Sequence, residues 1–284
     1  MTAVRPLRVV MLAESENVHH RRLATALAHR GHDVRILPCD ADPGTPDVIL
    51  AGPLPAVAEV TLRTSGAPLV AVSWGSDLLR DVPADSALAA RTATVLTRAA
   101  AVVVDSQAGE QVAVGLGAEP DRVFRFPWGI DLGRHPQRPL LDPPLRVVSL
   151  RSLVAEYRVD TLLRALALVP GIGADLAGDG PQAPDLRTLA VTLGIADRVR
   201  FHGRIGEEDV PVLLAGAHVH VSTAPTDGSS ISLLQALATG RPSIVVDNPT
   251  NREWIDPGRT GWLVPAGDAD VLAERLRALA ADPG

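Results

Sequence analysis

The chain has 284 residues, 46% of them hydrophobic and 21% charged, which is typical of a folded globular protein with room for one large domain or two ordinary ones. Its net charge of −6 argues against a nucleic-acid-binding protein, which normally presents a basic face. All 27 basic residues are arginine and Cys39 is the only cysteine, so mechanisms that need a lysine, an internal disulfide or a cysteine zinc site are excluded.

In the first half, short apolar runs alternate with segments of helical period. We expect strands at residues 8–13, 34–37, 48–51, 69–73 and 101–104, and helices at 18–30, 56–64, 86–98 and 108–115. The alternation is typical of a parallel sheet with crossover helices. The apolar run that ends at Ala13 is too short for a signal sequence, and no stretch approaches ~18 apolar residues. No membrane segment is therefore expected, and the cytoplasm is the expected location.

Prolines gather between the two halves. Pro127, Pro136, Pro139, Pro143 and Pro144 fall in a stretch with little periodicity, which favours a linker. The predicted domains are therefore residues 1–126 and 145–284, joined by a linker at 127–144.

The alternation restarts after the linker. We expect strands at 146–150, 174–177, 199–201, 218–222 and 243–246, and helices at 160–168, 183–193, 229–238 and 269–281. The predicted fold is α/β, with two Rossmann-like domains that face a central cleft at the carboxyl ends of their strands. Open sheets of this kind bind ligands at that edge.

The strongest functional segment follows the strand at 218–222. A polar turn leads to Gly228, where backbone can approach a ligand, and a helix then begins at Ser229 and Ser230. Free amides at a helix start suit an anion such as a diphosphate. The alternative is that Asp227 and Ser229 merely cap a buried helix.

The segment 227–242, DGSSISLLQALATGRP, resembles the signature of family-4 retaining glycosyltransferases of the GT-B fold. In that family the signature begins with a Glu or Asp, which is followed by seven residues and a second Glu. The helix then ends at a small residue followed by Gly, any residue and Pro. The resemblance implies that Asp227 approaches the donor sugar and that Gln235 binds the ribose. It also implies a run of backbone amides that holds the diphosphate, from Gly228, Ser229, Ser230 and Ile231.

Gln235 departs from this pattern, because the family has Glu there. Its amide oxygen still accepts from a ribose hydroxyl, but the charge-assisted bond is lost, which costs roughly 1 kcal/mol. Weaker donor binding is therefore expected.

Further segments match the family in order and separation. The strand at 146–150 followed by Arg151 resembles the family's phosphate-binding arginine, and Arg158 replaces the usual Lys-Gly as a second cation. Surface positions are the alternative for both arginines. The 177–181 and 199–204 segments resemble a Gly-Asp-Gly-Pro turn and a strand beside the nucleobase, which adds further donor-side residues: Gly178, Gly180, Gly203 and Arg204.

The first half supplies weaker matches. Residues 17–22 and 31–34 resemble the first helix of one subgroup, and 74–77 resembles its cleft loop. His19 and Asp77 are therefore candidates for the catalytic side of the cleft, although a hydrogen-bonded helix-start histidine explains His19 equally well. The nearby histidines lack the acid or cysteine spacing of a metal site, and the family generally needs no metal. We expect no metal and no cofactor.

The expected reaction is transfer of a sugar from a nucleoside diphosphate sugar to an acceptor hydroxyl, with retention of configuration. Two alternatives stay open: a weak or inactive homologue that binds the nucleotide sugar, and a GT-B-fold sugar-nucleotide epimerase. No hydrolase elbow, Walker motif or Gly-x-Gly-x-x-Gly turn is present. The acceptor and the donor's base and sugar are not specified by the sequence. The family's C-terminal crossover helices are expected to be missing.

Overall fold

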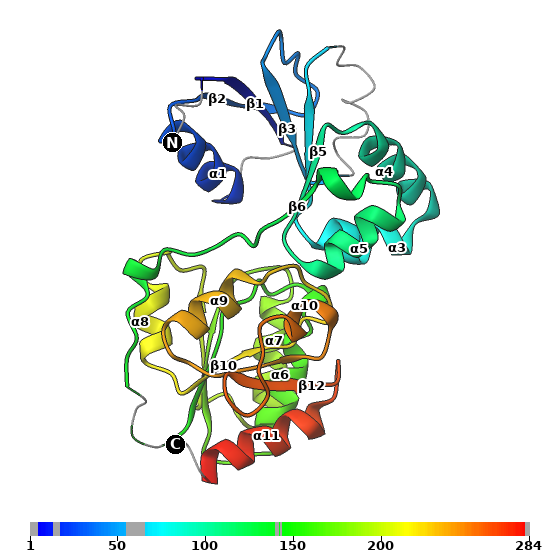
Figure 1. The fold of residues 1–284 in the computed structure, drawn as a ribbon. Coiled ribbons are helices and arrows are strands. Elements are labelled where there is room, and N and C mark those ends of the chain that lie inside the picture. The colour runs from blue at the N-terminus through cyan, green and yellow to red at the C-terminus, as the bar shows by residue number, and fades with distance from the viewer. Residues whose placement is uncertain (1–4, 14–17, 55–65, 140–141, 143, 282–284) are drawn as a thin grey trace. The chain divides into compact units, whose positions relative to one another are not determined.

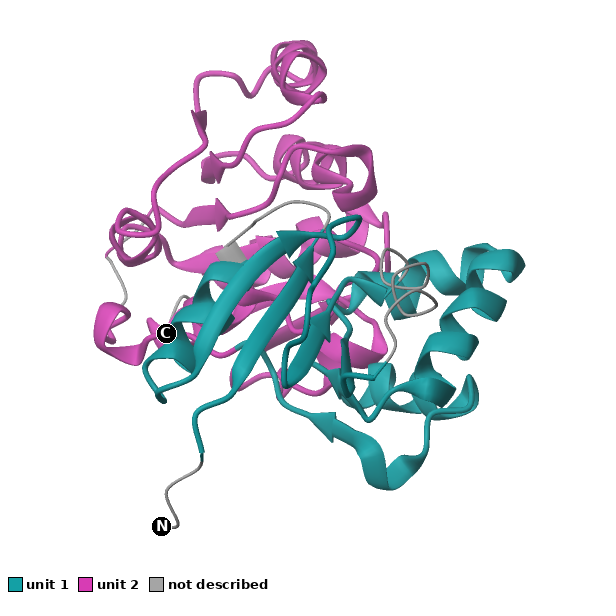
Figure 2. Cartoon of the chain, turned by 90° about the horizontal axis from the view of Figure 1, so that it is seen from above, with its two compact units in different colours: residues 1–128 teal, residues 129–284 magenta. Residues whose placement is uncertain are grey.

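The computed structural model describes residues 5–13, 18–54, 66–139, 142 and 144–281. They form two compact units, residues 1–128 and 129–284, which are coloured separately in Figure 2. Each unit is built on its own six-stranded parallel sheet, labelled in Figure 1. The prediction of two Rossmann-like α/β units is confirmed.

Unit 1 has the strand order β2-β1-β3-β4-β5-β6. Its elements are β1 (Arg8–Ala13), α1 (Val18–Ala28), β2 (Asp33–Pro38), β3 (Val48–Ala51), β4 (Leu69–Val72), η1 (Asp77–Asp81), α3 (Val82–Ala84), α4 (Ser86–Arg98), β5 (Ala101–Val104), α5 (Gln107–Gly115), η2 (Pro120–Arg122) and β6 (Val123–Arg125). The helix expected at 18–30 ends at Ala28, because Gly31 has a positive φ of 88° and closes a turn there. The helix expected at 56–64 lies outside the described residues.

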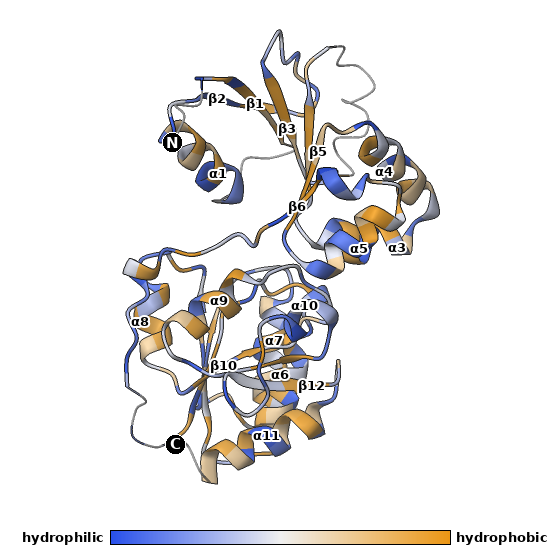
Figure 3. Cartoon of the chain, in the orientation of Figure 1, coloured by the Kyte–Doolittle hydropathy of each residue, from blue (hydrophilic) through white to orange (hydrophobic). Residues whose placement is uncertain are grey.

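The strands β1, β3, β4 and β5 consist almost entirely of apolar residues, and the strands in the middle of this sheet are orange in Figure 3. Successive side chains of a strand point to opposite faces. Val10, Ile49 and Val102 therefore face the core formed with α4 and α5. Their neighbours Val9, Val48 and Val103 face the other side, where α1 contributes Leu23 and Leu27 to a pocket described below.

Unit 2 has the strand order β12-β11-β10-β7-β8-β9. Its elements are η3 (Leu132–Arg134), β7 (Arg146–Ser149), η4 (Ala155–Tyr157), α6 (Val159–Ala167), β8 (Gly173–Ala177), α7 (Ala183–Thr192), β9 (Val199–Gly203), α8 (Val210–Ala215), β10 (Val219–Ser222), α9 (Ile231–Ala238), β11 (Ser243–Val246), α10 (Pro249–Arg252), β12 (Gly261–Val264) and α11 (Ala269–Ala281). Helices cover both faces: Val147 joins the core of α6, α7 and α11, and Val148 joins that of α8 and α9.

Part of the proline-rich segment is bound to unit 2. The backbone amide of Arg138 donates to the carbonyl of Thr239 at 3.3 Å. Arg241, only 1% exposed, donates to the carbonyl of Pro139 at 2.9 Å and to Leu214 and Ala215, at the end of α8, at 3.1 and 3.3 Å. The guanidinium therefore joins the linker, the end of α8 and the residues after α9.

Candidate functional site

The candidate site lies where the strand order of unit 2 reverses. β7 and β10 are parallel neighbours, although β8 and β9 come between them in the chain. Crossovers leave β7 and β10 in opposite directions, so their carboxyl ends border a crevice. Open α/β sheets bind ligands at such a switch point. Two predicted segments follow these ends: Arg151 follows β7, and the turn 223–230 follows β10.

Arg151 joins the two segments directly. Its Nη2 donates to Oδ2 of Asp227 at 2.5 Å, and its Nη1 donates to Oγ of Ser230 at 3.2 Å. The Arg151 side chain is 9% exposed and that of Asp227 is 22% exposed. The structure thus brings together a cation, a partly accessible carboxylate and a hydroxyl from two distant segments.

The start of α9 differs in detail from the expected start at residue 229. The helix begins at Ile231, because Ser230 has the extended backbone of an N-cap, with φ −63° and ψ 116°. The Ser230 side chain does not cap the helix and instead meets Arg151 and the hydroxyl of Ser232 at 3.0 Å. Asp227 accepts its hydrogen bond from Arg151. The capping alternative therefore does not account for Asp227, and the positive end of α9 lies beside the arginine.

The Gly-Asp-Gly-Pro turn packs against the backbone of the Arg151 segment. A Cβ on Gly178 or Gly180 would collide with the carbonyl of Arg151 or Leu153, so only glycine allows this close approach. The turn is tied in further, since the Leu153 amide donates to the carbonyl of Asp179 at 2.9 Å and the Gly178 amide to that of Gly203 at 2.8 Å. Gly178 and Gly180 therefore position the arginine segment.

The remaining donor-side candidates lie further apart. Gly203 ends β9 with φ 68° and open space above it, and Arg204 is exposed. Arg158 is exposed with φ 47°, and its guanidinium lies beside Gly267, ahead of α11. Within the described residues, no hydrogen bond or ion pair joins Arg158 to the Arg151–Asp227 pair. Gln235 is half-buried in α9, and its side chain makes no hydrogen bond within the described chain.

Three residues of the site are absent from the sequence prediction. The Tyr157 ring stacks on Arg151, with the guanidinium carbon 4.2 Å from the ring centre. The Thr223 hydroxyl donates to the Tyr157 carbonyl at 2.8 Å, and the Asn248 amide donates to the Pro225 carbonyl at 3.2 Å. Only Asn248 carries a sequence signal, because Asn before Pro is a common helix start.

Asp77 requires a correction. The sequence predicts that it faces an open cleft, but the structure buries it at 2% exposure. Its carboxylate accepts from four donors: the amides of Leu54, Trp74 and Leu78 and the hydroxyl of Ser73. Burial raises the pKa of Asp77, and these hydrogen bonds oppose the rise. Asp77 therefore holds its loop together within unit 1.

His19 lies in an aromatic cluster of unit 1. Its ring centre is 4.8 Å from that of Trp74 and 4.9 Å from that of Trp128. His20 packs on Trp74 at 4.5 Å and its Nε2 lies 3.3 Å from the carbonyl of Gly52. These contacts favour a structural role for His19.

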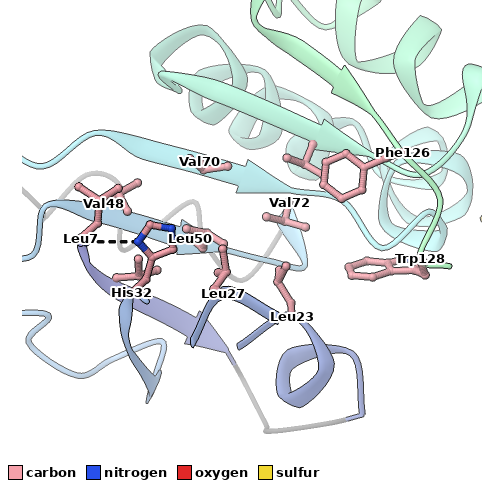
Figure 4. Close-up of a pocket in the computed structure, with 12 residues that line it drawn as sticks. Leu7, Leu23, Leu27, His32, Val48, Leu50, Val70, Val72, Phe126 and Trp128 are labelled. Atoms are coloured by element: carbon pink, nitrogen blue, oxygen red, sulfur yellow. Dashed lines mark hydrogen bonds between the residues drawn. The ribbon is translucent and has the colours of Figure 1, made fainter. Parts of the chain in front are cut away.

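Next to this cluster, unit 1 contains an apolar pocket of about 270 Å³, shown in Figure 4. Leu23 and Leu27 of α1 line one side, and strand residues such as Leu50 and Val72 line the other. His32 adds an imidazole to the lining, and the Nδ1 of that ring accepts from the Leu7 amide at 3.3 Å.

Within the residues that the structure describes, no three His, Cys, Asp or Glu side chains come together in a way that would hold a metal ion. No helix in the same residues has the length and apolar character needed to cross a membrane.

His220 lies on β10, the strand that leads into the candidate site, and its burial makes the stability of unit 2 depend on pH. It is 0% exposed, and burial, assisted by the charge of Arg151, lowers its pKa to about 3. Below about pH 6.5 the His220 imidazole binds a proton in the unfolded chain but stays neutral in the folded chain. The unfolding free energy should therefore fall by up to about 1.4 kcal/mol for each pH unit as the pH drops from 6.5 towards 3.

Chemical denaturation at several pH values tests this, with His220→Leu as the variant and the exposed His29→Gln as its control. His220→Leu should flatten the dependence between pH 4.5 and 6.5, and His29→Gln should not. An equal slope in wild type and His220→Leu would contradict the assignment.

Two Rossmann-like units, each on a six-stranded parallel sheet, define a protein of the GT-B fold class. The family is glycosyl transferases group 1, to which this chain belongs: the family's model matches residues 134–284, more than half of the chain. The resemblance found in the sequence is confirmed at that level.

Curated relatives share part of the chain. The lipopolysaccharide core biosynthesis glycosyltransferase LpsE of Rhizobium meliloti is 30% identical over 141 residues, which cover 50% of this chain and 41% of that protein. The putative colanic acid biosynthesis glycosyltransferase WcaL of Escherichia coli is 28% identical over 188 residues, 62% of this chain and 46% of that protein. The matches thus span less than half the length of either relative.

Solved structures show the same fold. HepE of Anabaena in complex with UDP and glucose has a TM-score of 0.79 at 18% identity, covering 97% of this chain and 90% of that one. Sucrose-phosphate synthase of Thermosynechococcus elongatus has a TM-score of 0.81 at 19% identity, with the same coverage.

Proposed function

We propose that this chain transfers a sugar from a nucleoside diphosphate sugar to an acceptor hydroxyl, with retention of configuration. The observation that carries the proposal is the contact of Arg151 with both Asp227 and Ser230 at the switch point of unit 2. The family and the names of its relatives support the same reaction class, and HepE forms a complex with UDP and glucose.

In the proposed reaction, the bond from the sugar's anomeric carbon to the diphosphate oxygen breaks and a bond to the acceptor oxygen forms. The departing diphosphate gains negative charge. Arg151, the hydroxyl of Ser230 and the amides at the start of α9 stabilise that charge. The acceptor proton passes to the departing diphosphate, so no separate base is needed.

Asp227 changes partner in this scheme. Its carboxylate now pairs with Arg151, and a bound diphosphate would compete for the same guanidinium. The released carboxylate is then available to hydroxyls of the donor sugar. The proposed site needs no metal, because arginine and helix amides meet the diphosphate charge. Unit 1 supplies the acceptor side, as the family resemblance implies.

The test is a thermal-shift screen with UDP-, GDP- and dTDP-sugars in buffer containing EDTA, followed by donor turnover with and without acceptor alcohols. A donor that binds raises the melting temperature by mass action. Turnover that requires an acceptor supports transfer, and conversion of the sugar without acceptor supports the epimerase alternative. If no donor raises the melting temperature or is consumed, the proposal fails.

Gln235→Glu separates an attenuated enzyme from a binding protein. A carboxylate accepts more strongly than an amide, so we expect donor KM to fall about fivefold to tenfold and turnover to rise. The matched control is Gln111→Glu, which makes the same change at an exposed position of helix α5 in unit 1 and should alter neither value. Tight donor binding without turnover in both wild type and Gln235→Glu would support the binding-protein alternative.

A further inference from the structure

We infer that Tyr157 is a positioning residue, which holds the Arg151 guanidinium in the orientation that receives the donor diphosphate. The inference rests on the proposed function. It concerns a residue that acts through another, since Tyr157 contacts the arginine and not the reacting atoms.

The ring is placed to fix the plane of the guanidinium. The Arg151 guanidinium carbon lies 4.2 Å from the centre of the Tyr157 ring, which is a cation–π distance. Two of the guanidinium nitrogens reach Asp227 and Ser230. The third, Nε, is buried and has no hydrogen-bond partner among the described residues. The ring face therefore supplies a contact that polar atoms do not.

Tyr157 is itself anchored on both sides of the crevice. It ends the short helix η4 after β7, and the following Arg158 turns the chain into α6 through a left-handed φ of 47°. Its carbonyl accepts from the hydroxyl of Thr223, directly after β10. The backbone from which the ring extends is therefore tied to the turn that carries Asp227.

This anchoring matters when the donor binds. The diphosphate must take over the guanidinium nitrogen that now binds Asp227, and the ion pair then no longer holds the side chain. The stack on Tyr157 persists through the exchange, because it uses the face of the guanidinium and leaves its edge for phosphate oxygens. A preorganised arginine binds more tightly than one that must be ordered on binding.

The experiment measures Kd by calorimetry for UDP, GDP and dTDP, and for inorganic pyrophosphate as a probe without a base. Tyr157→Ala should weaken binding about tenfold, and Tyr157→Phe, which keeps the ring, less than about twofold. Tyr157→Leu keeps the bulk without the ring face and should behave like Tyr157→Ala. Arg187→Ala, which removes a similar stack on Phe201, should bind pyrophosphate, the probe without a base, like wild type. The melting temperature of each unliganded variant is recorded beside its Kd.

A double-mutant cycle isolates the route through Arg151. In an Arg151→Ala background, Tyr157→Ala should cause no further loss of affinity. Full additivity, or equal binding by the Leu and Phe variants, would overturn the positioning role. If the wild type binds the probes and Tyr157→Ala binds them equally well, the positioning role fails but the proposed function does not. If the wild type binds none of the probes, the proposed function fails and the positioning role fails with it.

Discussion

Arg151→Ala should lower kcat/KM for sugar transfer by about 10²–10³-fold, the loss typical of one charge-stabilising donor in an active site. The side chain is 9% exposed, so water cannot easily replace it beside the start of α9. The change also frees Asp227, whose carboxylate then repels the incoming diphosphate. Both effects act on binding and on the departing charge, so KM should rise and kcat should fall together.

Steady-state kinetics on the donor found by thermal shift measure this loss. The control is Arg164→Ala, which removes another Arg–Asp pair of unit 2, on the exposed side of α6, where Arg164 Nε lies 3.5 Å from Asp160 Oδ2. It should leave kcat/KM unchanged, because exposed pairs contribute little. Arg151→Ala with wild-type kinetics would remove the basis for placing the donor at this switch point.

Much of the fold is readable from the sequence, because buried parallel strands are continuous apolar runs. β1, β3, β5 and β11 have the predicted bounds. β6 is missed, because Phe124 and Arg125 are exposed and the strand has only three residues. α8 is missed because Pro211 interrupts a short run, although proline is acceptable in the first turn of a helix.

The site is readable only in part. The spacing of the segment 227–242 singles out Asp227 and Ser230. Arg151 is singled out because it follows the apolar strand expected at 146–150. The place of Arg158 is not readable, because its left-handed backbone turns the side chain towards Gly267. The stack of Tyr157 on Arg151 joins residues six apart through a turn of no regular period, so no sequence pattern marks it.

Buried charge is the other feature that sequence does not reveal, and Arg241 is its clearest case. Burial lowers its pKa, and its hydrogen bonds go to three backbone carbonyls. Two of those carbonyls, Leu214 and Ala215, end α8, where the helix dipole favours a cation. Family resemblance covers the surrounding Gly-x-Pro stop, yet the side chain at x acts on a linker carbonyl 102 residues away.

Arg241→Met should lower the unfolding free energy of unit 2 by about 3 kcal/mol, because three carbonyls lose a charged donor in a place that water reaches poorly. Methionine keeps the apolar stem, so packing changes little. Arg198→Met is the matched control: Arg198 also donates to three carbonyls, of Leu166, Val169 and Ile172, but it is half-buried. Its loss should cost only about 1 kcal/mol, since water can replace it.

Denaturant titration gives the loss of unfolding free energy in each variant, and hydrogen exchange shows which segments are destabilised. Arg241→Met should raise exchange at the end of α8 and in the linker residues near Pro139, where its partners lie. Arg198→Met should raise exchange at the end of α6. Equal costs for both variants would mean that burial does not set the strength of these bonds. A cost for Arg241→Met confined to α8 would mean that the linker carbonyl at Pro139 is held by other contacts.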